Sequence, residues 1–506
     1  MEENTNKSLA INSIILYGRL ILTSIFSVLT TRYSLEALGV DDFGLFSVLG
    51  SVISFIAIIN TIMLSTSNRF IAVAIGRGNE EEIREQFNIN FIIHLIIAFV
   101  TILFAYPIGD WYINHHLNYN GDLSLAKWVF YLTVIGSAIS FVSVPYNGLL
   151  MAKEKFIVFC SVETVCSFFK LILSVGLLYL SENRLVVYAI GISLLSALPT
   201  LFYAIYCSSR YKDYVKFKLV KNKAKYREVL AFSVWVGYGA VACVGKSQGA
   251  ALLVNMFFST VMNTALGIAN SVNSMITMVA NAITQPVAPQ LTKCYAAGDY
   301  QRADNLLVLS IKLGYFAMFI IAVPLLLETE WILKIWLGDV PPYAVSFSQL
   351  MIIDALVISL NSGISTIIFA SGKIKLYQIS INTLRILAIV AGYFVLKAGY
   401  KSESLLITYI MFSVLIFFVI QYVLKKTLNY NTKYLWKRAY VPSILLTILF
   451  IPFIFVMREF HPVFRIILVM FFVVILIYRV GLSKAERLII NNKVRFLCCN
   501  SFICKQ

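Results

Sequence analysis

The segment Arg210–Arg227 reads RYKDYVKFKLVKNKAKYR and separates two long apolar runs, residues 185–207 and 229–256. It holds eight of the chain's 42 Lys and Arg residues in one short connection. Basic connections of this length between apolar spans are typical of the cytoplasmic side of a membrane protein. The segment therefore predicts a polytopic membrane protein that binds no nucleic acid, although the net charge of the chain is +17.

The composition of the whole chain points the same way. Of its 506 residues, 59% are hydrophobic and 13% are charged, whereas a soluble domain carries about 25% charged residues. This composition excludes a soluble enzyme, a secreted disulfide module and a disordered chain. The N-terminus lacks the basic region and the cleavage site of a signal peptide, so we expect the first span to be retained.

Apolar windows between polar breaks predict an all-α membrane protein with about fourteen transmembrane helices. The predicted spans are 9–34, 44–66, 88–107, 124–149, 156–180, 185–207, 229–256, 262–285, 306–327, 344–369, 376–397, 404–424, 439–457 and 463–480. The connections on one side hold 28 Lys and Arg residues, and those on the other side hold four. This bias predicts that both termini are cytoplasmic and that the number of spans is even, which twelve spans would also satisfy.

Short matches recur along the chain at an offset of 220 residues. Gly78-Asn79 corresponds to Gly298-Asp299, and the turn at 153–155 corresponds to the turn at 373–375. The matches predict two pseudo-symmetric six-helix lobes in a parallel repeat of the transporter kind. The expected organisation is an N-lobe at 1–207, a basic cytoplasmic linker at 208–228, a C-lobe at 229–424, two extra spans at 425–480 and a cytoplasmic tail at 481–506.

Two spans carry polar stripes along one helical face. The stripe in the first span is Ser8, Asn12, Arg19, Thr23 and Thr30, and the stripe in the eighth is Asn263, Gly267, Asn270, Ser274, Thr277 and Asn281. Such stripes either join helices through hydrogen bonds and close packing or line a water-filled cavity. For stripes of this length we favour the cavity wall.

Ionisable residues inside spans carry the sharpest signal, because a charge at mid-bilayer costs about 2.5–3.5 kcal/mol even on lenient scales. The deepest cations are Arg19, Lys170, Lys246 and Arg385, and the acids are Glu163 and Asp354. Other cations lie nearer span ends and are expected to snorkel: Lys312, Arg32, Lys127, Arg465 and Arg479.

If each buried acid pairs with one cation, two deep cations are left over. Surplus positive charge suits an anionic ligand such as a phosphate. The alternative is that all these groups form structural ion pairs between helices. Glu163 and Asp354 are also the candidates for coupling transport to a proton, because a carboxyl group in low dielectric titrates nearer to physiological pH.

Several kinds of chemistry have no signal in the sequence. There is no Walker-type phosphate loop, so we expect no ATP hydrolysis. The adjacent His115 and His116 are interpreted as a solvated turn, and neither a metal site nor a bound cofactor is expected beyond a coupling H⁺ or Na⁺. The external connections are short, which predicts no catalytic residues and no enzyme activity.

Four segments resemble a known family. They are LEALGVDDFGLFSVLGSVISF at 35–55, RFIAVAIGRGN at 69–79, NGLLMAKEKF at 147–156 and PQLTKCYAAGD at 289–299. These segments are similar to polysaccharide biosynthesis transporters, and more narrowly to Wzx-type O-antigen repeat-unit flippases. That family belongs to the multidrug, oligosaccharidyl-lipid and polysaccharide (MOP, MATE-like) exporter superfamily.

The resemblance implies a multi-pass protein of the bacterial inner membrane that acts in O-antigen, lipopolysaccharide or other surface polysaccharide biosynthesis. Such a protein moves an undecaprenyl-diphosphate-linked oligosaccharide among membrane lipids, with a polysaccharide polymerase and a chain-length regulator as further partners. In that family helices 1, 2, 7 and 8 face a cationic cavity. Arg19, Lys246 and the polar residues of span 8 match these positions.

Two other functions remain open from the sequence. A multidrug antiporter of the same fold usually takes cationic substrates, which a cationic cavity repels. A membrane-embedded glycan polymerase would place catalytic groups in a long external loop, which this chain lacks. The sequence therefore favours a flippase that works by alternating access.

Overall fold

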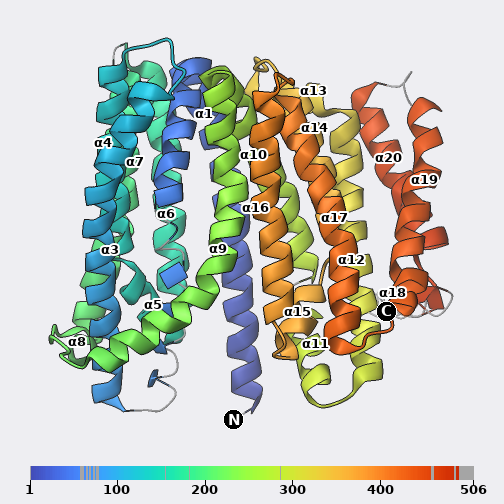
Figure 1. The fold of residues 1–506 in the computed structure, drawn as a ribbon, viewed down its shortest axis with the longest axis horizontal. Coiled ribbons are helices and arrows are strands. Elements are labelled where there is room, and N and C mark those ends of the chain that lie inside the picture. The colour runs from blue at the N-terminus through green and yellow to red at the C-terminus, as the bar shows by residue number, and fades with distance from the viewer. Residues whose placement is uncertain are drawn as a thin grey trace, which may run out of the picture. The chain divides into compact units, whose positions relative to one another are not determined.

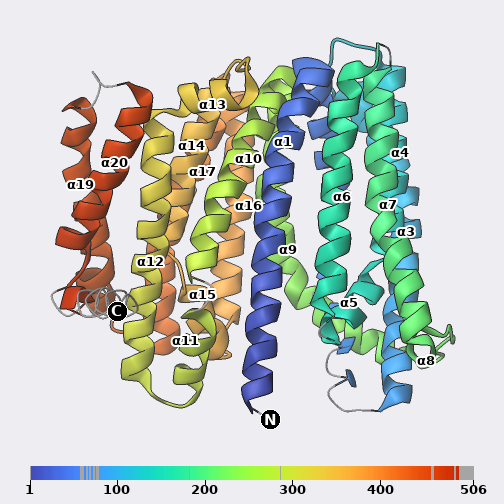
Figure 2. The ribbon, with the colours of Figure 1, turned by 180° about the vertical axis from the view of Figure 1, so that it is seen from behind.

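The computed structural model describes the chain except for residues 1, 57, 59–61, 64, 65, 68, 69, 72, 73, 76–78, 154, 182, 285, 286, 457–460, 484, 485 and 489–506. Within helices it also leaves undescribed the side chains of residues 2–17, 55, 56, 231, 232, 234–236, 279, 282, 283, 289, 293, 296 and 453–456. The described residues form helices joined by turns, with no strand among them, as Figures 1 and 2 show. The expected all-α class is confirmed.

The chain folds into two compact units. Unit 1 comprises Met1–Ile268, Pro341–Ala344 and Arg385–Leu405, and unit 2 comprises the remaining residues. The helices of unit 1 are α1 (Glu2–Ile56), α3 (Glu80–His115), α4 (Leu123–Phe141), α5 (Val144–Ala152), α6 (Phe156–Gly176), α7 (Arg184–Arg210), α8 (Lys212–Val215), α9 (Lys223–Phe257), the start of α10 (Thr260–Thr284) and the second half of α16 (Lys375–Lys397).

Unit 2 holds the rest of α10 and the first half of α16. Its other helices are α11 (Val287–Ala296), α12 (Tyr300–Leu327), α13 (Thr329–Leu337), α14 (Ala344–Ser359), α15 (Ile364–Ala370), α17 (Glu403–Leu428), α18 (Thr432–Leu435), α19 (Val441–Val456) and α20 (Pro462–Leu476). A π-helical turn follows α18 and another follows α20. The units differ from the predicted lobes at spans 7, 8 and 11, and the two-lobe organisation stays a prediction.

Eleven helices among the described residues are long and apolar enough to cross a membrane, or twelve if the bent pair α14 and α15 forms one span. The expectation of about fourteen spans differs from this count for two reasons. First, α1 contains two predicted spans. Second, α10 matches the eighth predicted span but is not among the eleven.

The break between the first two predicted spans lies inside α1, at Gly39. This residue has φ 77° and ψ 176°, a non-helical conformation that glycine adopts without steric cost. Spans 9–34 and 44–66 lie on either side of it. The predicted connection therefore coincides with the point where the helix breaks.

The core of unit 1 lies where the second half of α1 packs among α3, α4 and α7. Its buried residues include Leu45, Val48, Tyr112, Phe130 and Ala189. A second cluster lies at the other end of α3 and joins the Phe87 ring to residues of α5, α6 and α7. These two clusters fix α1 and α6, the helices that carry Arg19, Glu163 and Lys170.

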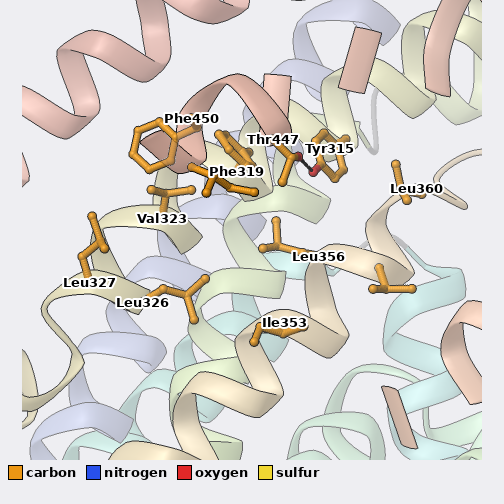
Figure 3. A pocket seen from close by; sticks show the side chains of 12 residues that line it. Tyr315, Phe319, Val323, Leu326, Leu327, Ile353, Leu356, Leu360, Thr447 and Phe450 are labelled. Carbon is orange, nitrogen blue, oxygen red and sulfur yellow. Dashed lines mark hydrogen bonds between the residues drawn. The ribbon is translucent and has the colours of Figure 1, made fainter. Parts of the chain in front are cut away.

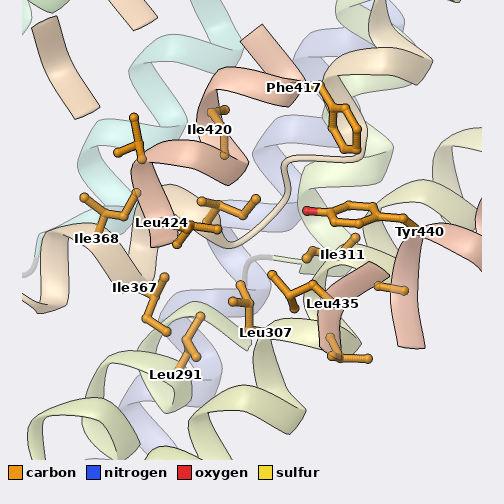
Figure 4. Close-up of a cluster of buried hydrophobic side chains, with 14 of the residues drawn as sticks. Leu291, Leu307, Ile311, Ile367, Ile368, Phe417, Ile420, Leu424, Leu435 and Tyr440 are labelled. Carbon is orange, nitrogen blue, oxygen red and sulfur yellow. The ribbon is translucent and has the colours of Figure 1, made fainter. Parts of the chain in front are cut away.

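The core of unit 2 brings together α11, α12, α15, α17 and the turn after α18. Figure 4 shows its side chains, among which Phe417 and Tyr440 lie close together. Their ring centroids are 4.9 Å apart, and the Gln421 amide donates a hydrogen bond to the Tyr440 hydroxyl at 2.7 Å. This contact anchors the segment that leads into α19.

Candidate functional site

Arg19 is held on α1 against the first turn of α6. Its guanidinium group lies 4.9 Å from the centroid of the Phe159 ring, a cation–π contact. The Arg19 Nε is buried and has no hydrogen-bond partner among the described residues. A buried donor without a partner is costly, so Arg19 is suited to an anionic group that would satisfy it.

Glu163 lies on α6, about one turn after Phe159. The Tyr203 hydroxyl of α7 donates a hydrogen bond to Glu163 Oε1 at 3.3 Å. Arg19 and Glu163 are both close enough to act electrostatically on the Cys160 thiol and the Tyr203 hydroxyl. We call Arg19, Phe159, Cys160, Glu163 and Tyr203 the Arg19 cluster; it joins α1, α6 and α7.

The Arg19 cluster lies near one end of unit 1. Phe159 is in the first turn of α6, at the end where the basic connections meet, and Lys170 lies about 16 Å further along the helix at 1.5 Å per residue. Lys170 makes no ion pair within the described part of the chain and is partly buried. From the sequence we counted Arg19 and Lys170 together among the deepest cations. In the fold, Lys170 lies about three helical turns away from the Phe159 ring that Arg19 contacts.

Lys246 and Arg385 belong to the same unit as Arg19. The contact between their helices is close: a Cβ atom on Gly245 of α9 would lie 3.2 Å from Cδ1 of Ile389 on α16. Lys246 follows Gly245, and Arg385 precedes Ile389 by about one turn. Because α9 packs on α16 at this point, the helical turn that carries Lys246 lies next to the helical turn that carries Arg385.

The polar stripe of α10 changes in character along the helix. Asn263 is buried, and its amide, oriented to satisfy both groups, donates to Ala251 O at 2.9 Å and accepts from Asn255 N at 3.2 Å. Asn270 is partly buried, whereas Ser274 and Asn281 are exposed. The stripe thus begins as a helix-packing contact, and the prediction of a cavity wall stays open for its later residues.

Two predicted polar residues lie on α1. The Thr23 hydroxyl donates to Arg19 O at 2.8 Å, within its own helix. The side chain of Asn12 lies outside the described residues. Neither observation tests the role expected of this stripe.

Asp354 joins two helices of unit 2. The Ser413 hydroxyl of α17 donates to Asp354 Oδ1 of α14 at 2.5 Å, and Ser413 is buried. The hydrogen bond therefore ties α14 to α17. This contact is a hydrogen bond from a neutral residue, so it tests neither the ion pair nor the ion coupling expected of Asp354, and both stay predictions.

Sequence reasoning missed a contact between the start of α10 and the break in α1. The Thr260 hydroxyl donates to Asp41 Oδ1 at 3.0 Å, and the Thr264 hydroxyl donates to Val40 O at 2.5 Å. Gly44 permits this approach, because a Cβ atom there would lie 2.1 Å from Thr260 O. We call these residues the α1–α10 contact.

A tyrosine from the loop before α4 extends the α1–α10 contact. The Tyr119 hydroxyl donates to Asp42 Oδ1 at 2.6 Å. Burial, followed by the hydrogen bond and the charge of Asp42, raises the pKa of Tyr119 above its ordinary value. Tyr119 therefore remains a protonated donor throughout the physiological range. The only sequence signal was the DDFG stretch at 41–44, which drew attention through its family resemblance.

The expectation that Lys312 snorkels is wrong. Its side chain on α12 is 4% exposed, and its Nζ lies 2.5 Å from Glu486 Oε2 in the segment that follows α20. Arg465, also expected to snorkel, pairs with Glu328 at 2.9 Å, and Lys127 pairs with Asp110 at 2.7 Å. These cations are neutralised by acids that lie at or beyond the span ends.

An apolar cavity of about 310 Å³ lies in unit 2 between α12, α14 and α19. Figure 3 shows Phe319, Phe450 and Leu356 around it. Its polar groups satisfy each other, since the hydroxyls of Tyr315 and Thr447 are 2.5 Å apart. The cavity can hold hydrocarbon and offers nothing to a charged group. Among the described residues, no three His, Cys, Asp or Glu side chains are placed to hold a metal ion.

Comparison with known proteins identifies relatives by sequence and by fold. A sequence profile of the family described as "Polysaccharide biosynthesis protein" matches residues 9–329. No curated protein matches the chain in sequence. The fold resembles that of the lipid II flippase MurJ in an inward closed conformation, with a TM-score of 0.67 and 15% identity over 93% of this chain and 99% of MurJ.

Two further solved structures share the fold. One is the inward-facing conformation of a multidrug resistance MATE family transporter of the MOP superfamily, with a TM-score of 0.65 and 14% identity over 82% of this chain and 99% of the other. The second is a variant of the Vibrio cholerae MATE transporter VcmN, with a TM-score of 0.59 and 14% identity over 85% and 98% of the two chains. At these identities the likeness concerns the fold.

Proposed function

The chain belongs to the polysaccharide biosynthesis protein family, and from this premise we propose that it is a flippase for lipid-linked oligosaccharides. Its substrate is an undecaprenyl-diphosphate-linked repeat unit, which it moves across the bacterial inner membrane by alternating access. The product enters the synthesis of O-antigen or another surface polysaccharide. Both termini face the cytoplasm in this proposal, because Lys and Arg residues concentrate in the connections on that side.

The observation that carries this proposal is the state of Arg19. A guanidinium group whose buried Nε has no hydrogen-bond partner in the described part of the chain lies at the end of unit 1 where the basic connections meet. A diphosphate group offers the oxygen atoms that such a donor requires. Lys246 and Arg385 supply further positive charge within the same unit.

The two alternatives receive less support. A multidrug antiporter would share the fold, but the deep cations disfavour the cationic substrates that such transporters usually take. A glycan polymerase is disfavoured because the related folds are those of proteins named as transporters and a flippase. A polymerase and a chain-length regulator remain proposed partners of this protein.

Removal of Arg19 or Lys246 tests the cationic site. In proteoliposomes loaded with an undecaprenyl-diphosphate oligosaccharide, we expect Arg19→Ala and Lys246→Ala each to slow flipping roughly tenfold to hundredfold, the loss of one hydrogen-bonded charge contact. Arg19→Lys should retain part of the activity. Lys334→Ala, at an exposed position of α13, is the matched control and should behave as wild type. Wild-type flipping by both alanine variants at normal abundance would disprove the site.

The carboxyl groups Glu163 and Asp354 test the coupling of transport to protons. We propose that Glu163 carries the coupling proton, because it shares the Arg19 cluster with Tyr203 and a buried cysteine. Flipping by Glu163→Gln should no longer respond to an imposed pH gradient. Asp354→Asn should still respond, because Asp354 joins α14 to α17. If Glu163→Gln follows the gradient as wild type does, Glu163 has only a structural role.

A further inference from the structure

We define the linker strip as Lys216–Lys221, with the sequence KFKLVK. It lies in the connection between the apolar helices α7 and α9 of unit 1. It follows α8 and precedes α9, and it forms no helix of its own. Figure 1 shows α8 and the first turns of α9 at the same end of unit 1, where α9 bends away from its own long axis. The strip therefore lies at the boundary between the apolar spans and water.

Asn88 of α3 fixes the backbone of the strip. Its amide nitrogen donates to Lys216 O at 3.1 Å, and its amide oxygen accepts from Lys218 N at 3.0 Å. Asn88 is fully buried, so this two-point contact is shielded from competing water. The strip is thus held in one position on unit 1.

The side chains of the strip alternate between two directions. Lys218 reaches Glu81 at 3.4 Å, and Val220 packs against the buried cluster around Ile89. Phe217 and Leu219 leave 61% and 60% of their surfaces exposed, although one edge of the Phe217 ring contacts Phe91 of α3, with ring centroids 6.3 Å apart. Two large apolar side chains are therefore presented outward from a segment whose backbone is fixed.

Unpaired lysines surround these apolar side chains. Lys216, Lys221 and Lys223 are exposed and make no ion pair within the described part of the chain. Two of the nearby acids are paired, since Glu81 contacts Lys218 and Glu85 contacts Lys225. Three further acids of this region are exposed, namely Glu80, Asp213 and Glu228. The strip therefore keeps a surplus of positive charge beside its apolar residues.

We propose that the linker strip binds the anionic lipid headgroups of the membrane surface. Apolar side chains that enter the interface and lysines that contact phosphate groups are the two features that bind a segment to an anionic bilayer. Each lysine near such a surface strengthens adsorption about fivefold. This binding does not depend on which molecule the protein transports.

Photocrosslinking in nanodiscs tests the proposal with the full chain. The photoreactive residue p-benzoylphenylalanine replaces Phe217 or Leu219, and nanodiscs contain phosphatidylcholine alone or phosphatidylcholine mixed with phosphatidylglycerol. We expect phosphatidylglycerol adducts, found by mass spectrometry, at both positions. The same photoreactive residue at the exposed Gln301 in unit 2 is the control. It should give adducts at least about fivefold less often, which is the factor expected for one lysine at the surface.

A charge variant completes the experiment. Replacement of Lys216, Lys221 and Lys223 by Gln alters exposed residues only, and size-exclusion chromatography checks that the variant is folded. We expect its preference for phosphatidylglycerol over phosphatidylcholine to fall by about fivefold or more. Equal labelling of both lipids by the unaltered strip, absence of lipid adducts, or crosslinking to a protein in cells would each overturn the proposal.

Discussion

Oxidation should stop transport when Ser47 and Gly267 are both replaced by cysteine. A Cβ atom on Gly267 would lie 3.9 Å from Ser47 Cβ, within the roughly 3.5–4.5 Å range that a disulfide requires. Ser47 lies in the second predicted span and Gly267 in the eighth, so the bond would join the two predicted lobes beside the α1–α10 contact. Under the alternating-access proposal the two predicted lobes separate at the α1–α10 contact during the transport cycle. A covalent bond beside this contact prevents that separation.

The readout is flipping in proteoliposomes before and after treatment with an oxidant, with a reductant added afterwards. Flipping should fall to the background of empty vesicles on oxidation and recover on reduction. The parent protein, with its native cysteines, controls for oxidation elsewhere. Undiminished flipping by the cross-linked protein would mean that the α1–α10 contact does not open during transport, and it would contradict the proposal that the predicted lobes separate there.

A matched pair within one predicted lobe distinguishes a blocked movement from simple stiffening. Ser34 of α1 and Ser174 of α6 have hydroxyl oxygens 2.8 Å apart and are both buried. Both residues belong to the predicted N-lobe, which moves as one body during rocking. The variant with Ser34→Cys and Ser174→Cys should therefore form its disulfide and keep its transport activity.

The positions of the helices were predictable because hydrophobicity is a local property of the chain. The hydropathy of each apolar window is enough to predict a membrane span. The connection between the first two spans lies at Gly39, which adopts a non-helical backbone conformation. The family resemblance, carried by short segments, is confirmed by the profile that matches 9–329. These conclusions required no knowledge of which helices are neighbours.

The partners of the polar groups were not predictable for the opposite reason. Asn263 has the helical position of a cavity residue, yet it hydrogen-bonds the backbone of α9. Lys312 has the position of a snorkelling residue, yet its acid lies 174 residues further along the chain. Hydropathy windows contain no information about such distant partners, because only the packing of helices brings them together.

Loss of Glu486 should therefore destabilise the protein strongly. Lys312 is almost fully buried, and its charge is neutralised by Glu486. Breaking a buried pair by removing one partner costs about 3–5 kcal/mol, because the remaining charge is uncompensated. We expect Glu486→Ala to lower the thermal midpoint of the purified protein markedly. Lys312→Met should cost less, because the Glu486 side chain is 28% exposed and water can reach it.

Two variants separate the ion pair from the local helix cap. Ser483 forms a capping box with Glu486, whose Oε2 accepts from Ser483 N at 2.7 Å. Ser483→Ala removes only the hydroxyl part of this box and should cost about 1 kcal/mol. The double variant with Lys312→Met and Glu486→Leu leaves no unpaired charge and should recover most of the midpoint lost by Glu486→Ala.

The effect of Glu486 should also depend on pH. Partial burial alone would raise the pKa of Glu486, but hydrogen bonds from Lys312 and Ser483 together with the lysine charge hold it below its ordinary value of 4.5. A carboxyl group with a lowered pKa in the folded state stabilises the fold above its ordinary pKa, and this stabilisation is lost as the pH falls. The difference in thermal midpoint between wild type and Glu486→Ala should therefore be full at about pH 7 and should shrink below the ordinary pKa of 4.5. A difference that stays constant through that range would show that the carboxylate is not the group that neutralises Lys312.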